Sequence, residues 1–296
     1  MTTTSGAHDT FAELDAMEAR TVVGAGGPAK RKGRLGDRLL FLYTWIVILW
    51  LCAPVFVMIL FSFNDLPKGA RVNTTWDGFS LRWYSLAEIN KIPDLSGAIR
   101  RSLEIAFLST IITTLLGTFI GIAIGKYRFR GQGSMNLLLF AVISAPETVL
   151  GASLLTLFVT AGVGTGFITI LIAHVMFSLA FVAVVVRARV LTLDPSIEEA
   201  AYDLGASWFT TFRRITLPML YPGILAGALL AFVLSIDDYV VTLFVYGSTT
   251  TFPLWIAGAS KLGLPPQVNV VGTVIFTFGV LIAIANAVTS RRRAAR

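Results

Sequence analysis

Six apolar stretches of about 20 residues constrain the fold of this chain more than any other feature. They cover approximately residues 39–61, 103–125, 135–159, 166–186, 222–246 and 268–289. A helix needs roughly 20 apolar residues to cross the ~30 Å hydrocarbon layer of a membrane. Lipid offers the backbone no hydrogen-bond partners, so each stretch must form its bonds internally, as a helix does. The sequence therefore predicts an all-α membrane protein with six transmembrane helices.

The composition agrees with a membrane protein and argues against a metal site. Apolar residues make up 55% of the 296 residues and charged residues 14%, whereas soluble domains carry about 25% charged residues. Cys52 is the single cysteine, which excludes an internal disulfide and a cysteine-based metal centre. The two histidines are His8 and His174, the latter inside the fourth stretch. We expect no metal site, and we expect His174 to hydrogen-bond a neighbouring helix.

Lysine and arginine are distributed unevenly between the two sides of the expected membrane. Sixteen lie close to the membrane on the side that carries both termini, and seven lie on the other side. Basic residues concentrate in the cytoplasmic loops of membrane proteins. We therefore expect both termini in the cytoplasm. The net charge of +7 then reflects topology, and we expect no binding of nucleic acid.

The ends of the chain differ from its middle. Residues 1–34 are small, polar and without periodicity, which predicts a disordered cytoplasmic tail. They do not resemble a signal peptide, because the first apolar stretch begins too late and is too long. The transmembrane domain is expected over residues 35–290, and a basic cytoplasmic tail over residues 291–296.

Glycines at a spacing of four residues mark candidate contacts between helices. Gly117, Gly121 and Gly125 lie in the second stretch, and Gly223 and Gly227 lie at the start of the fifth. Small residues four apart line one face of a helix and allow another backbone to approach closely. The triple predicts a helix–helix contact; the pair fits a contact and chance about equally well.

Three acidic residues lie deep inside the apolar stretches: Glu147, Asp237 and Asp238. A charge at the centre of a membrane helix costs about 2.5–3.5 kcal/mol on insertion scales, and no lysine or arginine lies within any stretch. Either burial keeps the acids protonated or a cation passes them. Neighbouring helix positions point about 100° apart. One aspartate can therefore face a pathway while the other caps a helix break or bonds a neighbouring helix. Pro146, before Glu147, can bend the third stretch.

The predicted cytoplasmic loop 187–221 contains signals for two short helices. Asp194 can cap a helix that begins at Pro195, and Gly205 can end it in the left-handed conformation. A second short helix is expected from Ser207 to Arg214, ended by Pro218. The apolar residues of these helices are expected to form an exposed face for a partner or to pack on the ends of the transmembrane helices: Leu204, Trp208, Phe209 and Phe212.

This loop resembles the EAA loop of ABC importer permeases. The matching residues stand at the spacing of that family: Glu199, Ala200, Ala201, Gly205, Ile215, Leu217 and Pro218. The resemblance implies that loop 194–218 forms a helix-turn-helix that couples the permease to a separate ATPase subunit. The chain has no G-x-x-x-x-G-K-[ST] phosphate loop. We therefore expect a non-catalytic subunit without a cofactor, with ATP and Mg²⁺ bound by the partner ATPase.

Further stretches resemble the spermidine/putrescine permeases of bacterial ABC importers. They are Ser62-Phe63-Asn64, the segment 76–84, the segment 127–131, and Leu234 to Asp238 followed by Val240-Val241. The resemblance implies a bacterial plasma-membrane importer of polyamines. The implied partners are a second homologous permease, two ATPase subunits and an extracytoplasmic substrate-binding protein.

A polyamine would pass the acids if they line a pathway. Its ammonium groups, separated by methylenes, suit separated carboxylates with aromatic surface between them. The expected pathway residues are Asp237, Asp238, Glu147 and Tyr239, although Tyr239 alone fits simple packing better. The outer loop 62–102 is expected to carry a short helix, and its aromatic residues fit either the membrane interface or contact with a binding protein.

Two other functions remain open on the sequence. One is an ABC permease for another solute, such as iron or thiamine, in which the acids are structural. The other is a secondary transporter that uses the acids as a proton relay. An intramembrane enzyme is disfavoured, because no nucleophile–base pair or metal cluster is evident.

Overall fold

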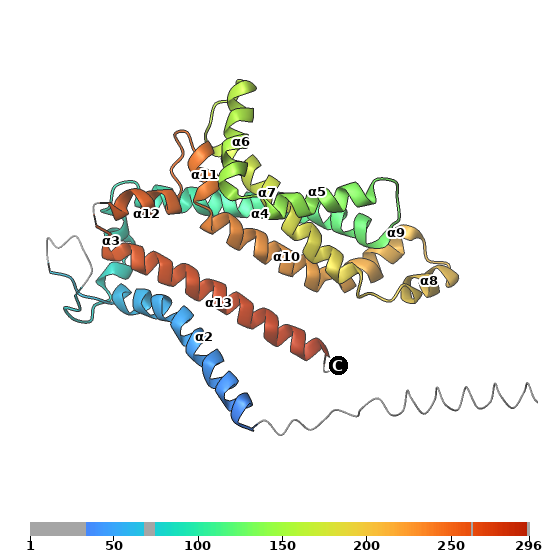
Figure 1. The fold of residues 1–296 in the computed structure, drawn as a ribbon, viewed down its shortest axis with the longest axis horizontal. Coiled ribbons are helices and arrows are strands. Elements are labelled where there is room, and N and C mark those ends of the chain that lie inside the picture. The colour runs from blue at the N-terminus through green and yellow to red at the C-terminus, as the bar shows by residue number, and fades with distance from the viewer. Residues whose placement is uncertain (1–33, 68–74, 262, 295–296) are drawn as a thin grey trace, which may run out of the picture. The chain divides into compact units, whose positions relative to one another are not determined.

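The computed structural model describes residues 34–67, 75–261 and 263–294, and these ranges are built of helices (Figure 1). The predicted all-α class is confirmed. In chain order the elements are α2 (Arg34–Ser62), η1 (Arg82–Tyr84), α3 (Leu86–Asn90), α4 (Leu95–Lys126), α5 (Gln132–Ser144), α6 (Glu147–Thr160), α7 (Phe167–Val190), α8 (Ser196–Asp203), α9 (Trp208–Thr211), η2 (Phe212–Thr216), α10 (Leu217–Asp237), α11 (Val240–Val245), α12 (Phe252–Ser260) and α13 (Pro266–Ala294). The predicted tail 1–34 lies outside the described residues except for Arg34, and the predicted tail 291–296 belongs to the end of α13 as far as Ala294.

The chain divides into two units, Met1–Phe56 and Val57–Arg296. The boundary falls within α2. The first unit contributes the N-terminal part of this apolar helix, up to and just beyond Pro54. All contacts described below lie within the second unit.

The six expected transmembrane helices are only partly matched by the described helices. Four helices are long and apolar enough to cross a membrane: Gly36–Ser62, Leu95–Lys126, Phe167–Val190 and Trp208–Asp237. The count rises to five if the bent pair α5 and α6 forms one span, and α13 contributes a shorter apolar helix, Pro266–Ile282. Length and composition of the described residues therefore give four or five spans, and the expected count of six is not confirmed.

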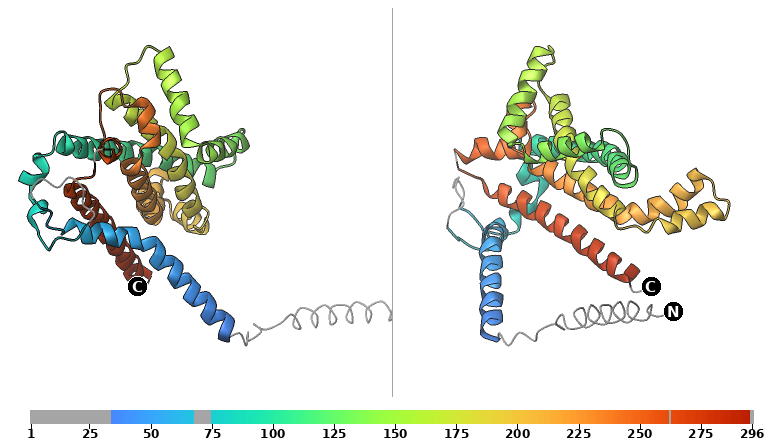
Figure 2. Two further views of the ribbon diagram at one scale, coloured as in Figure 1. Left: turned by 60° about the vertical axis from the view of Figure 1, so that its left-hand side comes forward. Right: turned by 45° about the vertical axis from the view of Figure 1, so that its right-hand side comes forward.

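The third apolar stretch is not one straight helix, because the chain is extended at Ala145 and Pro146. The chain direction changes by 106° between α5 and α6, and the bend is visible in Figures 1 and 2. A proline has no N–H group to continue a helix and pushes the residue before it to an extended conformation. Ala145 and Pro146 have ψ angles of 135° and 132° accordingly. The break places Glu147 at the first position of α6.

Helices α4, α7 and α10 pack against one another and form the centre of the second unit. The predicted glycine contact is confirmed, with α7 as the partner of α4. A methyl group on Gly117 would lie 2.8 Å from Cβ of Val182, and one on Gly121 would lie 2.8 Å from the carbonyl oxygen of Ala183. Real Cβ atoms do not approach this closely, so glycine is what allows the contact.

The second glycine pair also faces α7. A Cβ on Gly223 of α10 would lie 2.6 Å from Cβ of Arg189, and one on Gly227 would lie 3.1 Å from Cγ1 of Val182. Val182 is fully buried and contacts glycine positions on both α4 and α10. Figure 1 shows α8 and α9 at one end of these three helices, and α11 and α12 at the other.

The segment after α2 folds back through a buried asparagine. The side-chain Oδ1 of Asn64 accepts a hydrogen bond from the backbone N–H of Asp77 at 2.8 Å. The backbone carbonyl oxygen of Asn64 accepts one from the indole N–H of Trp83 at 2.7 Å. Its amide donates to the carbonyl oxygen of Thr75 at 2.6 Å. Two stretches that were noted separately in the sequence, 62–64 and 76–84, therefore form one compact structure. The expected short helix is present as η1 and α3.

Replacing Gly121 by alanine is expected to lower the free energy of unfolding by about 1–3 kcal/mol, because the added methyl overpacks the contact with α7. Reversible unfolding of the detergent-solubilised protein measures the change. Gly133→Ala in α5 is the matched control, since no atom lies within 4 Å of its added Cβ. Alanine favours a helix by up to about 1 kcal/mol over glycine, so this control should be neutral or stabilising. Equal effects of the two variants would contradict the close approach of α4 and α7.

Candidate functional site

The loop after α7 forms the two short helices that the sequence predicts. The backbone N–H of Ser196, the first residue of α8, donates to Oδ1 of Asp194 at 3.0 Å. This hydrogen bond, with a further one from the Ser196 side chain, holds the pKa of the Asp194 carboxyl below its ordinary value of 3.8. Gly205 follows α8 with φ of +80°, the left-handed conformation that glycine adopts without strain. The glycine turn is confirmed, and α8 begins one residue later than predicted, at Ser196 with Pro195 in the N-cap position.

The prediction that Pro218 ends the second short helix is wrong. The chain continues from α9 through η2, a π-helical turn, into α10. Pro218 lies in the first turn of α10. A helix tolerates proline there, and the π-helical bond from the N–H of Leu217 to the carbonyl of Phe212 carries the chain across the junction. The second short helix is therefore continuous with a membrane-length helix, Trp208–Asp237, whereas α8 is joined to it through the turn at Gly205.

The residues that resemble the EAA motif are mostly available for a partner. Glu199, Ala200 and Gly205 are exposed, as are Leu217 and Pro218, whereas Ile215 is half-buried and Ala201 is buried. The predicted apolar face is also present: Leu204, Trp208 and Phe209 are 89%, 60% and 63% exposed. Phe212 follows the other alternative and packs against buried residues of α4, α7 and α10.

Glu198, which the motif comparison passed over, connects three elements of the cytoplasmic end. Its carboxylate pairs with the ammonium of Lys126 at the end of α4 and accepts a hydrogen bond from Thr216 Oγ1 of η2 at 2.8 Å. Partial burial acts to raise the pKa of Glu198, but the hydrogen bonds from Lys126 and Thr216 more than offset it and hold the pKa below 4.5. The link is therefore formed in full at neutral pH and is lost only as the pH falls through that lowered pKa.

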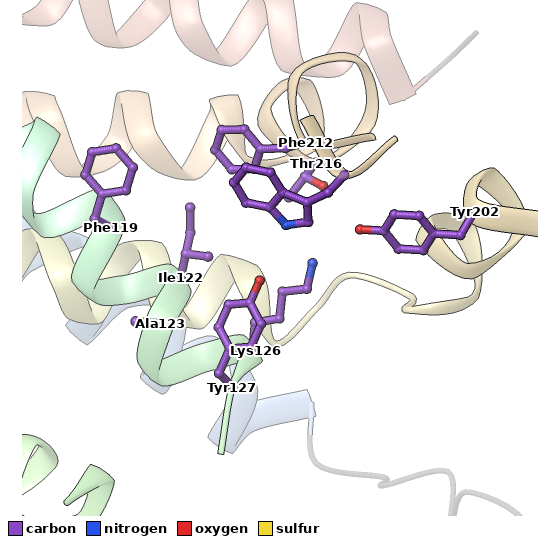
Figure 3. A pocket seen from close by; sticks show the side chains of 9 residues that line it. Phe119, Ile122, Ala123, Lys126, Tyr127, Tyr202, Phe212 and Thr216 are labelled. Carbon is purple, nitrogen blue, oxygen red and sulfur yellow. The ribbon is translucent and has the colours of Figure 1, made fainter. Parts of the chain in front are cut away.

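A pocket of about 190 Å³ lies beside this link. Figure 3 shows the Lys126 ammonium pointing into the space between the rings of Tyr127 and Tyr202. The pocket is lined by Phe119, Ile122, Ala123, Lys126, Tyr127, Tyr202, Trp208, Phe212 and Thr216. Trp208 stacks on Phe212 with ring centroids 5.7 Å apart. The short helices thus stand against α4 across a mostly apolar hollow.

The other end of the α4–α7–α10 group contains a buried hydrogen-bond network around His174. Its Nδ1 lies 2.7 Å from Oγ of Ser235 on α10, and its Nε2 lies 2.9 Å from Oγ1 of Thr242 on α11. Ser109 of α4 donates to the same Ser235 at 3.0 Å. The expected bond from His174 to a neighbouring helix is confirmed, and the network joins four helices. Ser109, Ser235 and Thr242 were missed in the sequence, although each is a polar residue inside an apolar stretch.

Asp238 interrupts the fifth stretch and caps the helix that follows. It is extended, with φ of −65° and ψ of 120°, between α10 and α11. Its carboxylate accepts hydrogen bonds from the backbone N–H of Thr242 at 2.8 Å and from Thr242 Oγ1 at 2.6 Å. His174 Nε2 lies 3.3 Å from the same oxygen, and the Asp238 side chain is only 4% exposed. Because the Thr242 hydroxyl donates to Asp238, it is left to accept from His174, so the tautomer with the proton on Nε2 satisfies the network.

The remaining predicted pathway residues lie at the same two helix breaks. Asp237 is the last residue of α10 and is exposed, and within the described residues it has no hydrogen-bond or ion-pair partner. Tyr239 follows the break and is 37% exposed. Glu147 is exposed at the start of α6, where the helix dipole favours a negative charge. Of the two aspartates, Asp238 is thus engaged within the chain and Asp237 is available.

The helices that follow the two breaks, α6 and α11, pack on each other. Helix α6 contacts α11, and Gly151 of α6 lies against the ring of Phe244. Leu154, Phe158, Val241 and Val245 belong to one buried cluster. No described contact joins Glu147 to Asp237, and within residues 34–67, 75–261 and 263–294 no group of three or more His, Cys, Asp or Glu side chains could hold a metal ion.

Several membrane-length helices, with short helices at one end and two helix breaks toward the other, define a polytopic membrane protein of the transporter class. The family described as binding-protein-dependent transport system inner membrane component matches residues 117–293. The chain belongs to this family.

Two relatives and one solved structure illustrate the similarity. The chain is 38% identical over 262 residues to the spermidine/putrescine transport system permease protein PotC of Escherichia coli (strain K12), covering 88% of this chain and 95% of the relative. It is 38% identical over 234 residues to the putrescine transport system permease protein PotI of the same strain, covering 76% and 81%. The structure of a bacterial ABC transporter involved in the import of the acidic polysaccharide alginate matches the fold with a TM-score of 0.60 at 16% identity, covering 90% of this chain and 99% of that chain.

Asp238→Asn is expected to lower the free energy of unfolding by about 1–3 kcal/mol, because an amide nitrogen replaces one of the two oxygens that accept from the α11 N-terminus and Thr242. Denaturant unfolding in detergent measures the change. Asp237→Asn is the matched control: the same substitution one residue earlier, at an exposed carboxylate without a described partner, should leave stability unchanged. Indistinguishable stabilities of the two variants would argue against the capping role of Asp238.

Proposed function

We propose that this chain is a transmembrane permease subunit of an ATP-driven ABC importer for polyamines, putrescine or spermidine. The observation that carries the proposal is the 38% identity to permeases named for these substrates, which extends over most of the chain. The chain itself would be non-catalytic and would bind no cofactor. ATP and Mg²⁺ would be bound by the partner ATPase.

The assembly would contain a second homologous permease, two ATPase subunits and an extracytoplasmic substrate-binding protein. The chain would lie in the bacterial plasma membrane with both termini in the cytoplasm, as the distribution of basic residues indicates. The end that carries α8 and α9 would then face the cytoplasm, and the helix breaks would lie toward the outer half of the membrane.

Contact with the ATPase would be made by the exposed residues of the EAA-like loop, Glu199, Ala200, Gly205, Leu217 and Pro218, with Ile215 and Ala201 packed beneath them. The exposed apolar side chains of Leu204, Trp208 and Phe209 would be covered by the same subunit. Because α9 continues through η2 into α10, movement of this surface would be transmitted directly to a helix that crosses the membrane.

The substrate pathway would pass the free carboxylate of Asp237, with Glu147 and Tyr239 nearby on the pathway wall. A helix broken within the membrane is a common location of transporter binding sites. The charge of Asp237 would attract an ammonium group, and Tyr239 would offer an aromatic face to the methylenes and the cation. Asp238 would contribute indirectly, by fixing the break that presents Asp237.

Asp237→Asn is expected to reduce uptake of labelled putrescine and spermidine about tenfold or more at limiting substrate, because a charge-assisted hydrogen bond contributes about 1.5–3 kcal/mol. Uptake is measured in cells, with ATP depletion as the control for energy source. Asp237→Glu keeps the charge and should retain most of the activity. Normal uptake by Asp237→Asn would favour a permease for another solute, such as iron or thiamine, and uptake that ignores ATP depletion would favour a secondary transporter.

Glu199→Arg is expected to leave the permease folded and to release or uncouple the ATPase subunits, because it reverses the charge of an exposed residue on the proposed docking surface. Co-purification of the ATPase with the tagged permease, together with uptake, measures the effect. Asp37→Arg, at an exposed carboxylate in the first turn of α2, controls for a charge reversal elsewhere. Normal co-purification and transport by the Glu199 variant would remove the loop from its proposed role.

A further inference from the structure

Helix α8 is attached to the membrane helices through very few side chains. Ala201 is its one buried residue, and the pocket of about 190 Å³ separates its Tyr202 from the end of α4. The chain continues from α8 into α9, η2 and α10 on one side and from α7 on the other, so α10 and α7 are joined to it covalently. Helix α4 is not joined to it in this way, although α4 packs closely on both.

Glu198 provides a link to α4. Among the described residues, its ion pair with Lys126 is the one ion pair that joins α8 to another helix. The side chains of Glu198 and Lys126 are 16% and 30% exposed, so the pair is partly shielded from water and is screened less than an ordinary surface pair. Glu199 stands about 100° further around α8 and is exposed. Two adjacent glutamates therefore face in different directions, one toward a partner and one toward the chain itself.

The second oxygen of Glu198 contacts a different element. It accepts a hydrogen bond from the hydroxyl of Thr216, a buried residue of the π-helical turn η2. Single π-helical turns within α-helices occur often at functional sites. One carboxylate thus holds α8, the end of α4 and the base of α10 together.

We propose that Glu198 is a positioning residue for coupling, which transmits displacement of α8 to α4 through Lys126 and to α10 through Thr216. The exposed surface around Glu199 would bind the ATPase, and Glu198 would convert motion of that surface into motion of the membrane helices. The inference rests on the proposed function, since it assumes that an ATPase docks on α8 and α9. It separates binding of the ATPase from transmission of its motion, and assigns them to neighbouring residues.

Glu198→Gln in the complete transporter, reconstituted in proteoliposomes with its binding protein, tests the proposal. The ATPase should co-purify and hydrolyse ATP as in the unaltered transporter, while substrate moved per ATP falls roughly fivefold or more, the lower end of ordinary coupling factors. Thr216→Val should give a smaller loss. The double variant Glu198→Lys with Lys126→Glu restores an ion pair of reversed polarity and should recover coupling relative to either single charge reversal.

Glu104→Gln is the matched control, because Glu104 forms an exposed ion pair with Arg100 elsewhere on α4, with N and O atoms 3.4 Å apart. It should leave transport per ATP unchanged. Full coupling in Glu198→Gln would overturn the proposal, and so would loss of ATPase co-purification, since Glu198 would then belong to the docking surface. An unaltered transporter that hydrolyses ATP but moves neither putrescine nor spermidine would instead refute the proposed substrate.

A distance measurement tests the link without any transported substrate. Spin labels on the exposed residues Asp203 and Arg128, in a Cys52→Ser background, report the separation of α8 from the end of α4. The Glu198 link predicts a narrow distance distribution that broadens in Glu198→Gln and narrows again in the charge-swapped double variant. Identical distributions in all three proteins would overturn the inference whatever the substrate is.

Discussion

A helix that stops inside a membrane leaves amide groups with no water to bind, and this chain stops twice within its apolar stretches. At the second stop the carboxylate of Asp238 accepts hydrogen bonds from the backbone N–H and the hydroxyl of Thr242. His174 lies beside this carboxylate and hydrogen-bonds Ser235, which in turn accepts a hydrogen bond from Ser109. Without such partners the break between α10 and α11 would be costly. The exposed position of Asp237, on which the proposed pathway depends, follows from a neighbouring aspartate that is fully engaged.

Each end of the α4–α7–α10 group contains an acidic side chain beside a basic one, and the two pairs have different roles. Near the helix breaks, a buried acid with a histidine fixes where a helix restarts. At the other end, a partly exposed acid with a lysine connects elements that are distant in sequence. The first is enclosed by four helices and favours one arrangement, whereas the second lies beside a hollow. This difference in surroundings suits a fixed pathway wall at one end and a movable connection at the other.

The fold class, the glycine contacts and the helix-turn-helix loop could be predicted from the sequence, because each depends on residues close together along the chain. The 106° turn between α5 and α6 could not be predicted in this way. Pro146 ends a helix, but the direction of the next one depends on how α6 packs against α11. The partners of the acids were hidden for a similar reason: Ser235 and Thr242 lie 61 and 68 residues from His174, and Lys126 lies 72 residues from Glu198. Only the positions of the helices in space decide these pairs. The roles of Asp237, Glu147 and Tyr239 in a pathway stay predictions.

Val182 fits between α4 and α10 because glycine faces it from both, at Gly117 and Gly227. These three positions share one small volume, so the spacing of the outer helices is set by the width of a single valine. Sliding α4 past α10 would open a void on one side of that side chain or force a collision on the other, and close-packed interiors resist both. The separation of α4 from α10 is therefore fixed at the level of Val182, and relative motion of the two helices is confined to tilting about this point.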